Sequence, residues 1–265
     1  MQETINLYAP ETDAHIARIE LWYDRIPEDA EVATTFDERW HHFQYDAEYE
    51  QYSGLILDSS TGLADAYYNH AKFKGRIGKE ADIASSIKGR IGPTLRAIAN
   101  TPIPVVVCCH LSREYESGTD IDAIAQYWPR LPGTLRSDSK GMFGEVYLTR
   151  FRFTKSRDDN GTKTVTRDYV IQANESDSFV AFSQLEAVKD MGEFDAKSYP
   201  YAAVAKAAKE AGNPFPHILL CGEPGTGKST WAATMIRPKV TKPVLVLMFD
   251  PRDKATPYMK RGVVK

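Results

Sequence analysis

One short segment constrains the fold more than any other feature of the chain. Residues 222–230 read Gly-Glu-Pro-Gly-Thr-Gly-Lys-Ser-Thr and fit the pattern G-x-x-x-x-G-K-[ST]. An apolar run, 217–221, precedes the segment, and a helical pattern, 228–236, begins inside it. Phosphate-binding loops need this context, because backbone N–H groups of the loop and the start of the helix together face the phosphate oxygens. The segment therefore predicts a nucleotide site on an α/β fold.

The loop also supplies the side chains that nucleotide chemistry requires. Lys228 is predicted to place a positive charge on the β- and γ-phosphates and so to be catalytic, and Ser229 to offer a hydroxyl to Mg²⁺. The expected cofactors are ATP and Mg²⁺. The predicted nucleotide-binding residues are Gly222, Glu223, Pro224, Gly225, Thr226, Gly227, Lys228, Ser229 and Thr230.

Three further candidates stand where apolar runs end. Asp58 ends the run 53–57, Asp250 follows the run 243–249, and His110 follows the run 101–109. Near-continuous apolar runs are typical of parallel strands buried on both faces, and ligands of such sheets gather at the carboxyl ends of the strands. We expect Asp58 to be the second magnesium residue, Asp250 to orient or deprotonate the attacking water, and His110 to sense the γ-phosphate. The alternative for each is a polar residue that caps the following turn.

Composition limits the class of protein. The 265 residues are 42% apolar and 26% charged, with a net charge of −3, which is typical of globular domains. No stretch of about 18 apolar residues predicts a membrane span, and no secretory signal is recognised. The three cysteines have no zinc-ligand spacing, and no disulfide framework is expected. These features predict a reduced, cytoplasmic protein. The mild acidity disfavours a wholly basic nucleic-acid surface but leaves a local basic groove open.

The remaining segments predict one domain over residues 1–265. Residues 1–50 carry 13 acidic side chains and are expected to form a solvated face around a helix at 33–49. The β-rich runs 145–153 and 164–172 flank a turn-like Asp-Asp-Asn-Gly, and 178–183 adds a short strand. This pattern predicts an antiparallel meander at one edge of the sheet. Residues 201–211 are predicted to be helical, and no linker divides the chain.

A basic segment lies between two of the predicted strands. Its cations are Lys72, Lys74, Arg76, Lys79, Lys88, Arg90 and Arg96, and Lys-Gly-Arg-Ile-Gly occurs at 74–78 and again at 88–92. We expect the glycines to mark loop ends around a helix. The segment is a candidate contact for a phosphate backbone, with Tyr67, Tyr68 and Phe73 beside it. A solvated helix face explains the same charges equally well.

Several segments together resemble the phage-type AAA/RecA-like nucleotide-binding proteins. They are Ile-Leu-Leu-Cys-Gly-Glu-Pro-Gly-Thr-Gly-Lys-Ser-Thr, Leu-Ile-Leu-Asp-Ser-Ser-Thr-Gly-Leu, Val-Val-Val-Cys-Cys-His-Leu-Ser-Arg-Glu, Pro132–Arg136 and Phe143–Tyr147. The resemblance implies a RecA-like P-loop NTPase sandwich of three layers around a mostly parallel sheet. It also implies a Mg-dependent ATPase of phage DNA recombination or replication, acting with single-stranded DNA in the host cytoplasm. A homo-oligomer with ATP sites between subunits is implied as well, in which Arg113, Arg136 or Lys140 is a candidate cation.

The chain departs from this family in the order of its parts. In the family the P-loop comes first, whereas here only 37 residues follow Lys228. Placing 191–265 (the Walker A half) before 1–190 (the Walker B strand, the sensor strand and the edge meander) restores the family order. We therefore expect a circularly permuted fold. The alternative is a truncated second P-loop domain.

Two other functions fit the same motifs. The chain can be a nucleotide-dependent binding switch or assembly module that hydrolyses little ATP, or a scaffold in which the loop serves only stability. A guanine-reading Asn-Lys-x-Asp motif is not found in the sequence.

Overall fold

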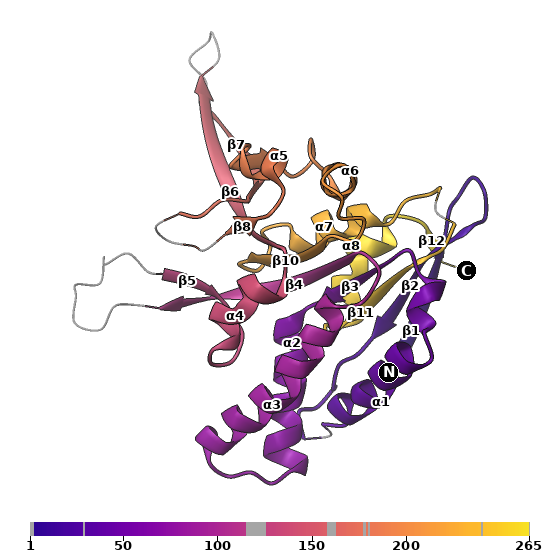
Figure 1. Ribbon diagram of the computed structural model, residues 1–265, viewed down its shortest axis with the longest axis vertical. Coiled ribbons are helices and arrows are strands. Elements are labelled where there is room, and N and C mark those ends of the chain that lie inside the picture. Colours follow the sequence, from indigo (N-terminus) through magenta and orange to yellow (C-terminus); the bar gives the residue numbers. More distant parts are fainter. Residues whose placement is uncertain are drawn as a thin grey trace.

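A single mixed sheet of 12 strands organises the computed structural model, which describes residues 3–28, 30–114, 126–157, 163–176, 179, 181–239 and 241–264. Six neighbouring strands run parallel to one another (Figure 1). In spatial order they are β2 (His15–Leu21), β11 (Val244–Met248), β3 (Gly54–Asp58), β4 (Val105–Glu114), β10 (His217–Gly222) and β6 (Glu145–Arg157). The prediction of an α/β fold with a mostly parallel sheet is confirmed at this level.

Antiparallel strands extend the sheet at both edges. One edge continues through β1 (Glu3–Tyr8) to β12 (Val263–Val264), and the other through β7 (Lys163–Gln172) to β9 (Glu193–Asp195). Two short strands, β5 (Gln126–Pro129) and β8 (Phe182–Ser183), pair with β4 and β6. The antiparallel strands predicted at 145–153 and 164–172 are therefore confirmed. The turn predicted between them, 158–161, lies outside the described residues.

Helices cover both faces of the sheet, because the parallel strands are apolar at nearly every position. One apolar core holds Leu55, Val105 and Leu219, and the other holds their neighbours Ile56, Val106 and Ile218. The first core packs under α1 (Val32–Tyr45), α2 (Ser60–Asn69), α3 (Glu80–Ala99) and α4 (Leu135–Met142). The second packs under α5 (Glu186–Lys189), α6 (Tyr201–Glu210), α7 (Lys228–Ala232) and α8 (Thr256–Met259). Short helical turns complete the set: η1 (Glu48–Gln51), η2 (His70–Lys74), η3 (Ala233–Met235) and η4 (Arg252–Ala255).

The N-terminal segment is more deeply built into the fold than its acidity predicts. It forms β1 and β2 as well as the expected helix. Glu20 in β2 is fully buried and pairs with Arg18 and Arg39, and Arg39 also pairs with Glu48. A solvated face was therefore the wrong prediction for Glu20, because two arginines neutralise its charge inside the protein.

The basic segment 72–96 also differs from its prediction. The second Lys-Gly-Arg-Ile-Gly copy lies inside α3 instead of at a loop end. A Cβ atom at Gly92 would lie 3.2 Å from a methyl carbon of Leu135, so the absence of a side chain there lets α3 approach α4. In the ranges described, no helix is both long and apolar enough to cross a membrane.

Two strands from residues 191–265 lie between strands from residues 1–190 in the sheet. β10 lies between β4 and β6, and β11 lies between β2 and β3. β10 and β11, the two parallel strands of the Walker A half, therefore hydrogen-bond on either side to strands from residues 1–190. This interleaving decides which side chains meet at the carboxyl edge of the sheet.

Candidate functional site

The phosphate-loop motif forms a tight turn between β10 and α7, as its sequence predicts. Gly227 has a φ of +91°, a conformation that glycine adopts without steric cost. A Cβ atom there would also lie 2.9 Å from the Tyr169 ring, and one at Gly222 would lie 2.1 Å from the Thr149 hydroxyl oxygen. The shape of the loop therefore depends on glycine at both positions.

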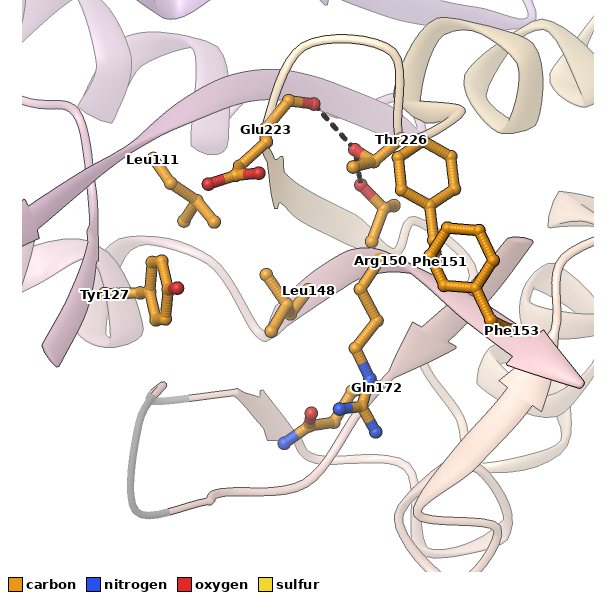
Figure 2. Close-up of a pocket in the computed structure, with 10 residues that line it drawn as sticks. Leu111, Tyr127, Leu148, Arg150, Phe151, Phe153, Gln172, Glu223 and Thr226 are labelled. Carbon is orange, nitrogen blue, oxygen red and sulfur yellow. Dashed lines mark hydrogen bonds between the residues drawn. The ribbon is translucent and has the colours of Figure 1, made fainter. Parts of the chain in front are cut away.

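Lys228 is almost completely buried inside this turn. Its Nζ donates to the backbone carbonyls of Gly222 and Glu223, each at 2.9 Å. The Thr226 hydroxyl oxygen lies 2.7 Å from the carbonyl oxygen of Glu223 and 2.7 Å from the hydroxyl oxygen of Thr149 (Figure 2). The ammonium group is thus held against the backbone of the loop.

Four neighbouring strands bring the predicted residues to one edge of the sheet. Asp250 follows β11, Asp58 ends β3, His110 lies in β4, and Gly222 ends β10. His110 pairs in register with Gly222, and β4 lies between the Asp58 strand and the loop strand. Because parallel strands share their carboxyl edge, the four groups converge although the sequence separates them widely.

A pocket of about 370 Å³ lies at this edge. Lys228, Ser229, Asp58, Asp250 and His110 all line it. Four other predicted residues, Pro224, Gly225, Gly227 and Thr230, line it as well, together with Tyr169, Asp253, Lys254 and Pro257. Glu223 and Thr226 instead line a second pocket of about 320 Å³ (Figure 2).

A buried tyrosine holds one of the two predicted magnesium residues. The Tyr258 hydroxyl donates to Oδ2 of Asp58 at 2.7 Å. Tyr258 is fully buried, and burial together with the nearby Asp58 charge raises its pKa well above the usual value. The hydroxyl therefore stays protonated and remains a donor to the Asp58 carboxylate. A serine hydroxyl and a carboxylate are oxygen ligands of the kind that Mg²⁺ takes alongside phosphate oxygens.

Burial and neighbouring charges shift the pKa values of Asp250 and His110. Burial, followed by repulsion from Asp58, raises the pKa of Asp250 to about 6. Burial, followed by the Lys228 charge, lowers the pKa of His110, so its imidazole is neutral near pH 7. A carboxylate with a pKa near the working pH is well suited to act as a general base.

A larger pocket of about 610 Å³ adjoins the first. Tyr169, Gly227 and Thr230 line both pockets. The other residues that line it are Ala196, Lys197, Pro200, Ala202, Trp231, Thr234, Ile236, Arg237, Pro238 and Arg261. This lining combines apolar side chains with three cations and contains no acid.

Two of the remaining candidates have contacts elsewhere in the protein. The guanidinium of Arg136 lies 5.5 Å from the Trp128 ring, and Lys140 pairs with Glu175 at 3.4 Å. Neither Arg136 nor Lys140 is among the described residues that line the pocket that holds Lys228. Arg113 lies in β4, and its side chain is outside the described residues.

The basic segment 72–96 directs several of its cations to internal contacts. Arg90 pairs with Asp37 and lies over the buried Tyr67 ring, and Lys74 lies 3.8 Å from Glu31. Tyr67 donates to Asp37 and is 1% exposed, so it offers no surface for base stacking.

Sequence reasoning missed Tyr258 and Tyr169. Neither residue belongs to a motif, and each reaches the site from an element outside the loop.

The chain was compared with known proteins. No protein-family model, no curated protein and no solved structure matches it.

Proposed function

We propose that this protein is a Mg-dependent ATPase built on a RecA-like sheet in circularly permuted order. The observation that carries the proposal is the single pocket lined by Lys228, Ser229, Asp58 and Asp250. These are the residue types that phosphoryl transfer to water requires: a cation and a loop for the phosphates, oxygen ligands for the metal, and a base for the water.

Each side chain has a distinct proposed role. Lys228 and the N–H groups of residues 225–229 bind the phosphates, while Ser229 and Asp58 hold the magnesium ion. A magnesium ion held there would neutralise negative charge on the phosphates. Asp250 takes a proton from the attacking water, and the neutral His110 hydrogen-bonds near the γ-phosphate. Catalysis by such a site is positioning together with electrostatic stabilisation.

The adjoining pocket is the proposed place of the nucleoside. Asp58, His110 and Asp250 line the pocket that holds Lys228 but not the adjoining pocket of about 610 Å³, and Gly227 and Thr230 line both. A triphosphate with its γ-end at Asp250 therefore directs its nucleoside toward Trp231 and Ile236. A mostly apolar pocket of about 610 Å³ has room for a base and a ribose.

The biological setting follows from the resemblance alone. We propose action in phage DNA recombination or replication, with single-stranded DNA as a partner and ATP sites completed by a second subunit. The interleaving of β10 and β11 with strands of the earlier segment supports reading 191–265 ahead of 1–190.

ATP turnover of the purified chain, with and without Mg²⁺ and single-stranded DNA, tests the proposal. We expect Mg-dependent turnover that Lys228→Ala abolishes. Asp250→Ala separates an enzyme from a binding switch, because the enzyme loses turnover while keeping ATP affinity. A chain that binds ATP tightly and turns over equally slowly with and without Asp250 would be a switch.

A further inference from the structure

The β6–β7 ribbon is the part of the fold that the proposed ATPase chemistry leaves unexplained. Beyond Thr149 and Val170 these two strands pair only with each other among the described residues. Figure 1 shows the ribbon projecting away from the rest of the sheet. A two-stranded ribbon is marginally stable in water by itself, so the projecting part depends on the rest of the sheet for its stability.

The two faces of this ribbon differ in chemistry. In register, Phe151 pairs with Tyr169, Phe153 with Arg167, and Lys155 with Val165. We call these six residues the aromatic face. The opposite face carries Arg150 and Arg152, which both pair with Glu193 of β9, and it also carries Asp168. The charges of the opposite face are therefore largely balanced within the protein.

The outer part of the aromatic face is exposed, and the face has an excess of positive charge. Phe151 and Tyr169 are half-buried, whereas Phe153 is 61% exposed and Val165 is 57% exposed. Lys155 and Arg167 are exposed beside them, and the Arg167 guanidinium lies 3.2 Å from the centre of the Phe151 ring. No acidic side chain belongs to this face between 149 and 156 or between 164 and 171.

We propose that the aromatic face binds a single strand of nucleic acid, an inference that rests on the single-stranded DNA partner of the proposed function and assigns that partner a surface. Bases stack on the Phe153 ring and on the Phe151–Arg167 pair, while Lys155 and Arg167 contact phosphates. Unpaired bases expose the flat faces that stacking needs, whereas a duplex buries them. Glu223 lines the pocket at the foot of the ribbon, together with Phe151 and Phe153 (Figure 2). Its negative charge opposes a phosphate there and favours contacts on the outer part of the ribbon.

The same face reaches the phosphate loop. Phe151 and Phe153 line one pocket with Thr226, and the Tyr169 ring lies against Gly227. A strand on the ribbon is therefore placed to influence the loop through these rings. The binding surface itself does not depend on ATP hydrolysis, so it can be tested without nucleotide.

Fluorescence anisotropy with a labelled oligothymidylate measures binding in the absence of ATP. We expect Phe153→Ala to weaken binding about tenfold and Phe153→Trp to restore it, because stacking and not volume is lost. Lys155→Ala should reduce the slope of log affinity against log salt by about 0.7. Thr154→Ala, on the opposite face, and Lys209→Ala, an exposed lysine on α6, are controls that should bind like wild type.

Two results would overturn the proposal. One is wild-type affinity in Phe153→Ala and Lys155→Ala, or equal affinity for duplex and single strand. The other is an oligomer that Phe153→Ala dissociates while oligothymidylate binding is unchanged, which would make the ribbon a contact between copies. Lys228→Ala should still bind the oligonucleotide, so a failure of the ATPase proposal leaves this test intact.

Discussion

The Tyr258 hydroxyl donates a 2.7 Å hydrogen bond to the Asp58 carboxylate, which lies 200 residues earlier in the chain. Both side chains are buried. This bond connects the segment after β11 to the end of β3 and fixes the carboxylate beside the phosphate loop. The fold therefore positions, through this bond, a carboxylate that the proposed reaction uses.

Removing that hydroxyl should destabilise the protein. Tyr258→Phe leaves a buried carboxylate oxygen without its donor, and we expect a loss of about 1–3 kcal/mol in the free energy of unfolding. Urea denaturation measures the difference. Tyr45→Phe is the matched control, because Tyr45 is 75% exposed, and it should change stability by less than about 0.5 kcal/mol. Equal stability of the two variants would show that the bond contributes nothing.

The raised pKa of Asp250 predicts that activity falls at acidic pH. Its pKa is raised to about 6, so kcat/KM should fall about tenfold per pH unit below pH 6 as the proposed base becomes protonated. A pH–rate profile between pH 5 and about 9 measures this limb. A profile that stays flat through pH 6 would remove Asp250 from the role of base.

The same pKa shift predicts that the ionised form of Asp250 lowers the stability of the folded protein. The folded-state pKa of Asp250 lies above the value of 3.8 for an unperturbed group, so folding disfavours its ionised form. Its contribution to stability is therefore fully present below pH 3.8 and is lost as the pH rises through about 6. Asp250→Asn should be more stable than wild type at pH 8, by about 1 kcal/mol after solvent screening, and should show no gain near pH 4. Thermal unfolding at the two pH values provides the comparison, and a variant less stable than wild type at pH 8 would contradict it.

The proposed nucleoside pocket can be filled without touching the phosphate loop. Ala202 lines this pocket from α6, and Ala202→Phe should occupy space that a base and ribose would need. We expect ATP affinity to fall about tenfold or more, while binding of inorganic tripolyphosphate stays near wild type. Isothermal titration calorimetry with the two ligands makes the comparison. An equal loss for both ligands would indicate a general distortion instead of a nucleoside subsite.

The buried ion pairs between Glu20, Arg39 and Glu48 predict a stability effect far from the candidate site. Glu20 is completely buried, and Arg39 bridges it to Glu48. Arg39→Ala leaves Glu20 with Arg18 alone, and we expect a loss of about 3 kcal/mol in urea denaturation. Lys206→Ala breaks an exposed pair with Glu210 and should change stability by less than about 0.5 kcal/mol. Similar effects for the two variants would contradict the importance of burial.

Local sequence was enough to predict much of the sheet. Buried parallel strands are recognisable because both of their faces are apolar, and this is why β3, β10 and β11 agree with the apolar runs. β4 differs from its predicted run 101–109, because it begins at Val105 and continues past His110 to Glu114. The loop motif is equally local, since its glycines permit the tight turn that Gly227 adopts.

What sequence could not provide is the set of contacts made across the sheet. Tyr258 and Tyr169 reach the loop through pairings between distant segments, and no spacing in the chain encodes them. In the sequence, Glu20 is one more acid of a charged segment, whereas in the structure it pairs with Arg18 and Arg39. The basic segment 72–96 suggested a phosphate contact, yet Arg90 and Lys74 face acids of the same protein. Charge alone does not show where its partner lies.

The most direct test of the central claim is ATP turnover measured in parallel for wild type, Lys228→Ala and Asp58→Asn, with and without Mg²⁺. If the two distant segments form one nucleotide site, wild type should hydrolyse ATP only with Mg²⁺. Lys228→Ala should then lose turnover together with ATP binding, and Asp58→Asn should lose turnover and magnesium dependence. Circular dichroism and urea denaturation confirm that the variants are folded. Turnover in Asp58→Asn with the magnesium dependence of wild type would contradict the claim, because the Asp58 segment would then lie outside the site.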